Sequence, residues 1–332
     1  MPIRVVHFGL GPIGAAVVRQ VAGRKGFKVV GAIDIDPAKI GRDLGDVVAL
    51  GRRLKVKVLP DAARVLKSTR PDVVVLCTSS SLKKVFAQIE TILKARVPIV
   101  STTEELSYPE WNQARLARKI DALARKAKVA VLGTGVNPGF VMDALPITLT
   151  GVCERVDSVA VNRVQDARIR RLPFQQKIGA GLTREEFQRR VEAGTVRHVG
   201  LTESISMIAD AVGWTLDRIT DDIEPQIAAE RVSSEFLTVE PGRVCGIRQD
   251  GIGYRGGEAL IRLHMEAYLG APESYDSVTI EGSPRLMMKI AGGVHGDVAT
   301  ASIVVNSIPK VIDASPGLKT MRDLPVPSFF GG

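Results

Sequence analysis

The sequence of 332 residues contains little of what marks several classes of protein. Its three cysteines, Cys77, Cys153 and Cys245, are spaced neither as a disulfide framework nor as a metal-ligand motif. Free thiols of this kind suit a reducing compartment, so we expect a cytoplasmic protein with buried, unreactive cysteines. The four histidines are equally dispersed, and we therefore predict no metal centre. They are His7, His198, His264 and His295.

Long apolar runs and secretion signals are also missing. No run approaches the about 18 apolar residues that a membrane-spanning helix needs. The first apolar strand begins at residue 3, which leaves no signal-peptide pattern ahead of it. We therefore expect no membrane partner. The sequence also lacks an internal repeat, a low-complexity linker, a P-loop lysine motif and a nucleophile elbow.

The positive charge does not follow the pattern of a nucleic-acid-binding protein. The net charge is +9, but aromatic residues make up only 5% of the chain. Nucleic-acid-binding surfaces combine clustered cations with aromatic side chains. Here the 45 lysines and arginines are spread along the chain, and runs such as 168–171 are short. We expect no nucleic-acid partner, and we assign the charge to solvated faces or to attraction of an anionic cofactor and substrate.

The strongest positive signal lies in the first 34 residues. An apolar strand enters a glycine-rich turn, a helical pattern follows, and a second apolar strand ends on an acid. The turn reads Gly9-Leu10-Gly11-Pro12-Ile13-Gly14. Its last glycine lies 20 residues before Asp34, which is the spacing of a dinucleotide-binding βαβ unit. In such a unit the glycines permit a tight turn and close approach of a pyrophosphate, and the helix N-terminus offers N–H groups to the phosphates.

The acid at the end of the second strand predicts which dinucleotide binds. Asp34 can accept hydrogen bonds from the ribose diol of NAD, whereas its negative charge would repel the 2′-phosphate of NADP. Ile35 stands where an NADP-binding chain often carries arginine. We therefore predict NAD as the cofactor. Lys39 and Arg42 lie close enough in the sequence to leave NADP open.

The order of elements predicts two domains of different class. Over residues 1–140, strands alternate with helices, which predicts an α/β domain with a doubly wound parallel sheet of the Rossmann type. From about residue 141, strands at 155–164, 231–239, 242–250, 258–268, 277–281 and 283–291 are separated by Gly and Pro. With helices at 183–193 and 201–212, capped by Thr183 and Thr202, they predict an α+β domain with a mostly antiparallel sheet over 141–300. Residues 301–332 should form a helix and tail that return to the first domain, with Asp297 as the cap of that helix.

Polar residues follow three strands of the predicted parallel sheet. Because ligands of such a sheet bind beyond the carboxyl ends of its strands, we expect these residues to flank the cofactor. A carboxylate at that edge is a candidate general base, although acids also favour the start of a helix. The serine-rich segment equally fits a helix-capping turn. The residues are Thr78, Ser79 and Ser80, then Thr102, Glu104 and Glu105, and finally Asn137, Pro138 and Gly139.

The second domain carries candidate substrate ligands. Arg163 and Gln165 share one face of a predicted strand, and Asn162 lies on the other. An arginine beside an amide suits a carboxylate, because the guanidinium can bind it through two hydrogen bonds, although a solvated sheet face has the same pattern. Weaker candidates are His264, on an alternating strand, and Thr300, near the start of the last helix.

Several segments together resemble a known family. Besides the glycine turn, they span 101–109, 133–143, 176–182 and 293–300, with Asp323-Leu324-Pro325 near the end. Along nearly the whole chain they resemble the 2,4-diaminopentanoate dehydrogenase family and the native amine dehydrogenases similar to it. The first domain also resembles that of dihydrodipicolinate reductase. The His-His pair, lysine and Ser-Gly-Thr-Ala segment of that reductase are absent here.

The resemblance implies a reaction and a set of residues. The reaction is reversible, NAD(P)-dependent oxidative deamination of an amine whose nitrogen is not α to a carboxylate. The substrate would be 2,4-diaminopentanoate or a similar amine, or a simple ketone with ammonia in the reductive direction. The catalytic carboxylate falls on the Glu104-Glu105 pair, of which we prefer Glu104 because it is nearer the strand end. The polar pocket falls on Asn137, Arg163 and His264.

Two other functions stay open on the same scaffold. One is a reductase of a C=N or C=C bond that exchanges no ammonia, similar to dihydrodipicolinate reductase. The other is a sensor that binds NAD without turnover. We also expect a homodimer, because an exposed sheet face in a second domain of this kind commonly serves as a dimer interface.

Overall fold

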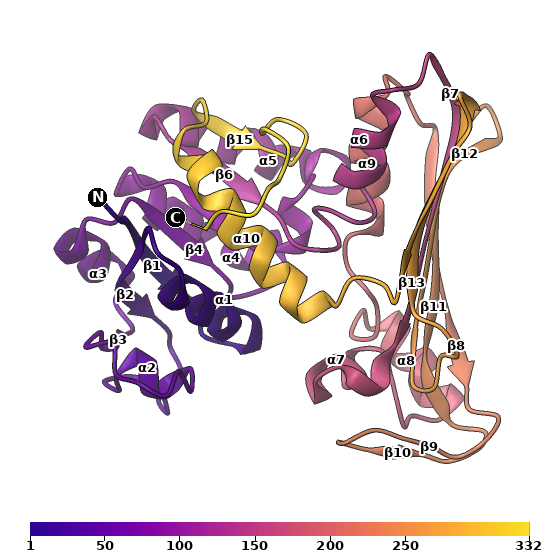
Figure 1. Cartoon of the computed structure of the whole chain (residues 1–332), viewed down its shortest axis with the longest axis horizontal. Coiled ribbons are helices and arrows are strands. Elements are labelled where there is room, and N and C mark those ends of the chain that lie inside the picture. Colours follow the sequence, from indigo (N-terminus) through magenta and orange to yellow (C-terminus); the bar gives the residue numbers. More distant parts are fainter. Residues whose placement is uncertain (332) are drawn as a thin grey trace. The chain divides into compact units, whose positions relative to one another are not determined.

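The computed structural model describes residues 1–331 and divides into two compact units (Figure 1). Unit 1 consists of Met1–Phe140 together with the C-terminal segment from His295 onward, and unit 2 consists of Val141–Val294. The second unit thus ends earlier than the predicted residue 300. The reason is that helix α10 (Gly296–Ile312) packs against α1 (Pro12–Gly23) and belongs to unit 1 throughout its length.

Seven parallel strands form the sheet of unit 1, in the order β15-β6-β5-β4-β1-β2-β3. The chain moves outward from β1 in both directions, which places the reversal of strand order beside the glycine-rich turn. The predicted Rossmann-type sheet is confirmed. The strands are β1 (Ile3–Phe8), β2 (Phe27–Ile33), β3 (Val58–Leu59), β4 (Val73–Leu76), β5 (Ile99–Ser101), β6 (Ala130–Gly133) and β15 (Gly317–Lys319).

Helices cover both faces of this sheet. On one face α3 (Ala62–Thr69), α4 (Leu82–Lys94) and α5 (Glu110–Ala127) bury a continuous apolar layer against the strands. On the other face α1 and α10 pack side by side (Figure 1). Two short helices complete the unit, α2 (Leu44–Val47) and the 3₁₀ turn η1 (Glu104–Leu106).

Unit 2 is built on a six-stranded sheet in the order β14-β13-β7-β12-β11-β8. Of its neighbouring pairs only β7 and β12 run parallel, so the prediction of a mostly antiparallel sheet is confirmed. The predicted strand at 231–239 is instead the separate hairpin of β9 (Val232–Ser233) and β10 (Thr238–Val239). The six strands are β7 (Arg155–Asp166), β8 (Arg218–Ile227), β11 (Val244–Arg255), β12 (Glu258–Tyr268), β13 (Tyr275–Ser283) and β14 (Leu286–Ala291).

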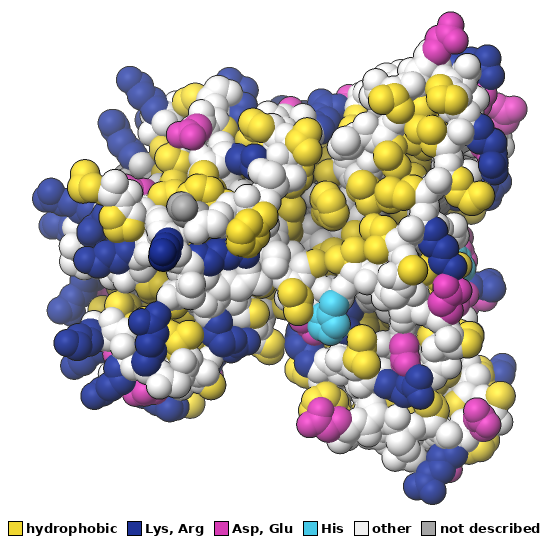
Figure 2. Space-filling model, in the orientation of Figure 1, with side chains coloured by type: hydrophobic (Ala, Val, Ile, Leu, Met, Phe, Trp, Pro, Cys, Tyr) yellow, Lys and Arg dark blue, Asp and Glu magenta, His cyan; other side chains and the backbone are white. Residues whose placement is uncertain are grey.

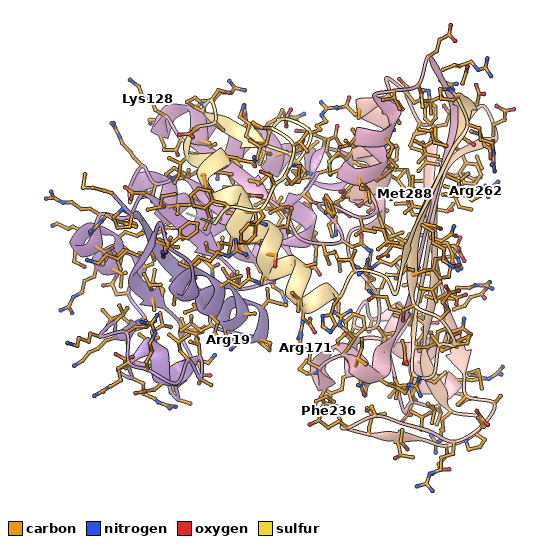
Figure 3. All side chains as sticks on the ribbon, viewed as in Figure 1. Arg19, Lys128, Arg171, Phe236, Arg262 and Met288 are labelled. Atoms are coloured by element: carbon orange, nitrogen blue, oxygen red, sulfur yellow. The ribbon has the colours of Figure 1, made fainter. Side chains whose placement is uncertain are left out.

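The helices of unit 2 lie on one side of its sheet (Figure 1). We call this side the inner face and the opposite side the outer face. Figure 3 shows Met288 pointing toward the inner face and Arg262 toward the outer face. The elements on the inner side are α6 (Ala144–Thr150), η2 (Ala167–Ile169), α7 (Leu172–Lys177), α8 (Arg184–Glu192) and α9 (Leu201–Ala211).

The helix caps agree with the sequence in part. Thr183 caps α8 in a capping box with Glu186, with hydrogen bonds of 3.1 and 2.9 Å, as predicted. Helix α9 instead begins after Gly200, whose φ of +122° favours glycine, while the Thr202 hydroxyl binds Glu203. Asp297 lies inside the first turn of α10 and is not its cap. The two predicted caps at 202 and 297 are therefore wrong.

Candidate functional site

The glycine-rich turn joins β1 to α1, and its three glycines serve different purposes. Gly9 has a φ of +92°, and a Cβ there would lie 2.5 Å from the Cys77 carbonyl oxygen. A Cβ on Gly14 would lie 2.1 Å from the Gly9 carbonyl oxygen. A Cβ on Gly11 would meet nothing within 4 Å. Packing within the protein thus requires Gly9 and Gly14, whereas Gly11 borders open space at the start of α1. That is where a pyrophosphate would lie, and the first turn of α1 contains no acid to repel it.

Asp34 is fixed to this turn. Its Oδ2 accepts a hydrogen bond from the Leu10 N–H at 2.7 Å, and its Oδ1 accepts one from the Asp36 N–H at 2.9 Å. The ammonium of Lys39 lies 3.3 Å from Asp34 and 3.2 Å from Asp36. The next residue, Ile35, is 79% exposed. The structure thus brings a carboxylate for a ribose diol and a cation beside it to the same position.

The residues after β4 lie next to those after β5. Thr78 donates to Gln88, the Ser79 hydroxyl accepts from the Ser81 N–H, and the Ser80 carbonyl accepts from the Glu105 N–H. The Thr102 N–H in turn donates to Leu76, the last residue of β4, at 3.0 Å. The bonds from Glu105 to Ser80 and from Thr102 to Leu76 hold the two predicted polar segments together at the carboxyl edge of the sheet.

The thiol of Cys77 lies at the same edge. Burial raises its pKa to about 11, so the thiol stays protonated at neutral pH. A protonated, buried thiol is a poor nucleophile. Cys77 as a residue is only half-buried, as is Cys153, so the expected full burial holds for Cys245 alone of the three cysteines.

The two adjacent glutamates after β5 are held differently. The Glu105 carboxylate accepts a hydrogen bond of 2.7 Å from the Leu82 N–H, the first residue of α4. It therefore caps that helix, where the macrodipole favours a negative charge. The sequence left open that an acid in this pair only stabilises the start of a helix. Glu105 has that role, and the helix is α4. Glu104 is half-buried on η1, and it is the carboxylate that we carry forward as the candidate base.

The segment after β6 folds back beside the start of α10. Gly139 has a φ of +124°, and a Cβ there would lie 2.4 Å from the Gly135 nitrogen. Thr300 accepts a hydrogen bond of 3.4 Å from the Val136 N–H. Within unit 1 the fold thus brings Thr300 to the segment that contains Asn137, Pro138 and Gly139. Asn137 is 7% exposed, and its bond to Pro138 is cis.

Thr134 is a residue of this segment that sequence reasoning missed. Its hydroxyl oxygen is buried and has no hydrogen-bond partner within residues 1–331. An unpaired buried hydroxyl marks a place where a water or a ligand group can bind. Only the burial of the hydroxyl identifies it, because a threonine after a strand is common in any sequence.

Arg163 and Gln165 share the inner face of β7, as the alternation predicts, but Arg163 is already bound. Its Nη1 lies 2.7 Å from an Asp276 carboxylate oxygen, and its Nη2 donates to the Val294 carbonyl at 2.8 Å. The Arg163 side chain is 2% exposed. Burial raises the pKa of Asp276 against the attraction of Arg163, and it lowers the pKa of Arg163. Direct binding of a substrate carboxylate by Arg163 does not fit this geometry.

His264 lies on the outer face and does not share a pocket with Arg163. In the pairing of β12 with β7, His264 is opposite Asn162, and Met265 is opposite Arg163. The imidazole binds Asp250 at 2.6 Å and Glu266 at 3.2 Å. The predicted pocket is wrong at this position, because the register between two strands decides which residues share a face, and one strand alone does not reveal it.

The inner face instead carries a polar region that sequence reasoning missed. Arg170 donates to Gln165 at 2.7 Å, and its guanidinium lies 4.0 Å from the centre of the Phe174 ring. Gln249 is fully buried and binds the backbone N–H and carbonyl of His198, both at 2.9 Å. A third bond of 2.7 Å ties Gln249 to Asp221. These residues come from four helices and strands and from two loops, which is why no sequence pattern joins them.

Four cations lie near His198. Burial lowers the pKa of His198 well below 6.5, and these cations lower it further. The imidazole is therefore neutral at pH 7, with its Nδ1 lying 2.9 Å from the Val199 carbonyl. Two of the cations are paired with carboxylates, Arg163 with Asp276 at 2.7 Å and Arg197 with Asp221 at 3.2 Å. The other two are Lys177 and Arg170.

Neither a metal-binding cluster nor a membrane-spanning helix occurs in the described part of the chain. Within residues 1–331, no three or more His, Cys, Asp and Glu side chains are arranged to hold a metal ion. Over the same residues, no helix has both the length and the apolarity that a bilayer crossing requires.

Comparison with known proteins extends over the whole chain. Residues 140–332 match the family model described as the 2,4-diaminopentanoate dehydrogenase C-terminal domain. Residues 3–134 match the model described as dihydrodipicolinate reductase, N-terminus. The chain is 36% identical to 2,4-diaminopentanoate dehydrogenase of Acetoanaerobium sticklandii, over 99% of this chain and 95% of that protein. It is 24% identical to amine dehydrogenase of Streptomyces virginiae, over 99% and 98%.

Solved structures agree with these matches. An amine dehydrogenase from Mycobacterium smegmatis is similar with a TM-score of 0.88 and 29% identity, over 100% of this chain and 98% of that chain. A dihydrodipicolinate reductase from Paenisporosarcina sp. TG-14 shares the fold with a TM-score of 0.52 and 16% identity, over 96% and 98%. The chain therefore belongs to the 2,4-diaminopentanoate dehydrogenase family and is an NAD(P)-dependent amine dehydrogenase.

Proposed function

We propose that the protein catalyses reversible oxidative deamination with Glu104 as the general base. The observation that carries this proposal is that the two adjacent glutamates differ in position. Glu105 caps α4, whereas Glu104 lies at the carboxyl edge of β5. Only a neutral amine has the lone pair that expels a hydride, so Glu104 first takes a proton from the substrate ammonium. When bound, the nicotinamide accepts that hydride.

Glu104 also serves the second half of the reaction. After it has released that proton to solvent, it takes a proton from the water that attacks the iminium carbon. It then gives this proton to the amine nitrogen of the resulting carbinolamine. The C–N bond breaks, the hydroxyl proton is lost to solvent, and ammonia leaves as the carbonyl forms. A carboxylate beside the developing cation lowers the energy of the transition state through charge attraction. In the reductive direction the same group returns the proton to the amine.

The test of this proposal is ammonium dependence. NADH or NADPH oxidation is followed with a small ketone, with and without an ammonium salt. An amine dehydrogenase oxidises the cofactor only when ammonium is present. Oxidation without ammonium would favour a reductase of a C=N or C=C bond. If no ketone, amino ketone or cyclic imine supports oxidation, the protein is a binding protein without turnover.

We propose NAD as the preferred cofactor. The fit rests on the open space at Gly11 and on the Asp34 carboxylate, which is held to the turn by the Leu10 N–H. Lys39 offsets part of the charge of Asp34, and for that reason NADP is the second candidate. Titration of the protein with NADH and with NADPH, followed by the fluorescence of the reduced nicotinamide, measures the preference directly. The proposal predicts tighter binding of NADH.

We propose that the substrate carries a carboxylate in addition to its amine, as 2,4-diaminopentanoate does. The support is Arg170, a cation near His198 on the inner face of unit 2. A guanidinium such as that of Arg170, ordered by Gln165 and Phe174, suits a carboxylate. A γ-keto acid and a methyl ketone of the same length, compared by kcat/KM with ammonium, distinguish this class from simple ketones. The keto acid should be the better substrate.

We propose a homodimer that forms through the outer face of unit 2. Its polar side chains already pair across strands, as Asn162 does with Ser277 and His264 with Asp250. The edge strand β14 adds Met287, which is 69% exposed. Light scattering after gel filtration measures the state in solution. Met287→Asp should shift a dimer toward monomer without changing the fold.

A further inference from the structure

The chain returns from unit 2 to unit 1 immediately after Val294, and side chains hold this residue by both backbone groups. Its N–H donates to Asp276 Oδ2 at 2.7 Å. Its carbonyl accepts from Arg163 Nη2 at 2.8 Å and from Gln165 Nε2 at 3.0 Å. These three side chains come from β7 and β13 of the sheet. We call Arg163, Gln165 and Asp276 the clamp.

Two members of the clamp also hold each other. Arg163 Nη1 lies 2.7 Å from Asp276 Oδ1, and both side chains are 2% exposed. A buried ion pair is weak evidence for stability, because removing two charges from water offsets most of their attraction. In this pair, each partner uses its second polar atom on Val294. The pair is therefore best explained by the backbone that it holds.

The backbone around Val294 has few features of its own that restrict its conformation. Gly292 and Gly293 precede it with φ values of +76° and +65°, and Gly296 starts α10. Glycines impose few limits on the backbone, so this stretch is intrinsically free to change conformation. A Cβ on Gly293 would lie 3.5 Å from Asp276 Oδ2, so the stretch lies directly against the clamp. Side chains of the sheet therefore fix the conformation of this segment.

The clamp is connected to Arg170, in the polar region of the inner face. The amide of Gln165 donates to Val294 through its nitrogen and accepts from Arg170 through its oxygen, at 3.0 and 2.7 Å. Arg170 is in turn stacked on Phe174. One buried amide thus holds both Val294, at the unit 2 end of the crossing, and the Arg170 side chain of unit 2.

We propose that Arg163, Gln165 and Asp276 are positioning residues for the reaction and do not bind the substrate. They fix the unit 2 end of the crossing and hold Arg170 in register with it. Because they touch no reacting group, their loss should impair turnover of every substrate alike. The part of this inference that concerns turnover rests on the proposed function, whereas the part that concerns the crossing can be measured on the protein alone.

The first experiment measures the crossing without any activity assay. Hydrogen–deuterium exchange is followed in peptides that cover residues 290–297, in Arg163→Met and in Asp276→Asn. The matched control is Arg155→Met, which makes the same change on the same strand at an exposed ion pair with Asp157. Exchange should rise about tenfold or more in the clamp variants and stay unchanged in the control. Unchanged exchange in the clamp variants would overturn the proposal.

A milder variant guards against loss of the fold. Gln165→Met keeps the ion pair and removes one bond to Val294 as well as the bond to Arg170. If Arg163→Met and Asp276→Asn do not fold, the exchange of 290–297 in Gln165→Met decides in their place. Peptides from β11 and β12 serve as the internal reference, because a local effect leaves them unchanged.

The second experiment separates positioning from substrate binding. Steady-state kinetics with ammonium compare a γ-keto acid with a methyl ketone of the same length, in the wild type, Arg163→Met, Asp276→Asn and the double variant. We expect kcat to fall about tenfold or more for both substrates, with the double variant no worse than the single ones, because the residues act as one unit. The affinity for NADH should not change.

The outcomes discriminate the alternatives. A loss confined to the keto acid would make Arg163 a substrate ligand and overturn the proposal. Additive losses in the double variant would also overturn it, because they would mean that the two residues act independently. If neither the wild type nor any variant turns over a substrate, the proposed function is wrong. The clamp is then tested by the exchange experiment alone.

Discussion

Among single residues, the sharpest contrast is between the two adjacent glutamates after β5. We expect Glu104→Gln to lower kcat by about 10²–10⁴-fold, the usual contribution of a general base, with unchanged affinity for NADH. Glu105→Gln keeps an acceptor for the Leu82 N–H and loses only the charge at the start of α4. It should cost about 0.5 kcal/mol of unfolding free energy and leave kcat within a few fold. Steady-state kinetics and thermal unfolding of both variants measure these effects. Loss of turnover in Glu105→Gln alone would exchange the two roles.

We expect the choice of dinucleotide to depend on Asp34. Its removal takes away the acceptor for a ribose diol but also the charge that repels a 2′-phosphate. Asp34→Ala should therefore raise the Kd for NADH about tenfold, the typical effect of losing a charged hydrogen bond, and change the Kd for NADPH less. Asp36→Ala is the control. Asp36 also binds Lys39, but it does not lie directly after β2 beside the glycine-rich turn. An equal loss for both cofactors would remove the argument for NAD.

How far the site could be predicted depends on how local its signals are. The glycine turn, Asp34 and the Glu104-Glu105 pair follow strands directly, and their positions need only one element each. The sequence predicts the correct face of β7 for Arg163. It does not indicate the partners Asp276 and Val294, which come from other parts of the chain. His264 was placed in the wrong pocket because its position depends on the register of β12 against β7. Residues brought together by register or by loop packing have no signal in a single sequence.

At the level of elements, the strands and helices that escaped prediction share a physical cause. Strand β8 reads Arg-Ile-Thr-Asp-Asp-Ile-Glu-Pro-Gln-Ile and lies at the edge of its sheet, so few of its positions need to be apolar. Helices α6 and α7 have seven and six residues, which is too short to be stable without the contacts around them. Elements with long apolar patterns, such as β12 and α9, begin and end within a residue or so of their predicted bounds.

Strand β1 contains a group that should make stability depend on pH. Burial lowers the pKa of His7 from 6.5 to about 3, and the side chain is 1% exposed. The folded protein therefore holds His7 neutral, while the unfolded chain binds a proton below pH 6.5. Its contribution is complete above pH 6.5 and is lost as the pH falls toward 3, by about 2 kcal/mol between pH 7 and pH 5. Urea unfolding of the wild type and of His7→Met across this range should show a flatter profile in the variant. Parallel profiles would contradict it.

Over the whole molecule, charge is distributed unevenly between the units. Unit 1 holds 27 Lys and Arg against 14 Asp and Glu, a net +13, whereas unit 2 holds 18 against 22, a net −4. In the view of Figure 2, Lys and Arg crowd the surface of unit 1, while unit 2 shows both signs. The unit with the glycine-rich turn is thus the one whose field attracts anions. Such a field raises association rates, and it is screened within about 10 Å at 0.1 M salt.

This uneven charge predicts how salt affects cofactor binding. The association rate of NADH, measured by stopped-flow fluorescence, should fall between 20 and 300 mM NaCl (roughly the range over which the screening length shortens most), while the dissociation rate changes little. The fall should be steeper for NADPH, which carries the additional charge of its 2′-phosphate. Lys126→Glu, on the exposed end of α5 and away from the turn, should lower both association rates slightly, and that of NADPH more than that of NADH, because it acts only through the long-range field. A salt dependence confined to the dissociation rate would instead mean that direct ion pairs, such as one with Lys39, dominate, and the distribution of charge over the molecule would then have no part in cofactor capture.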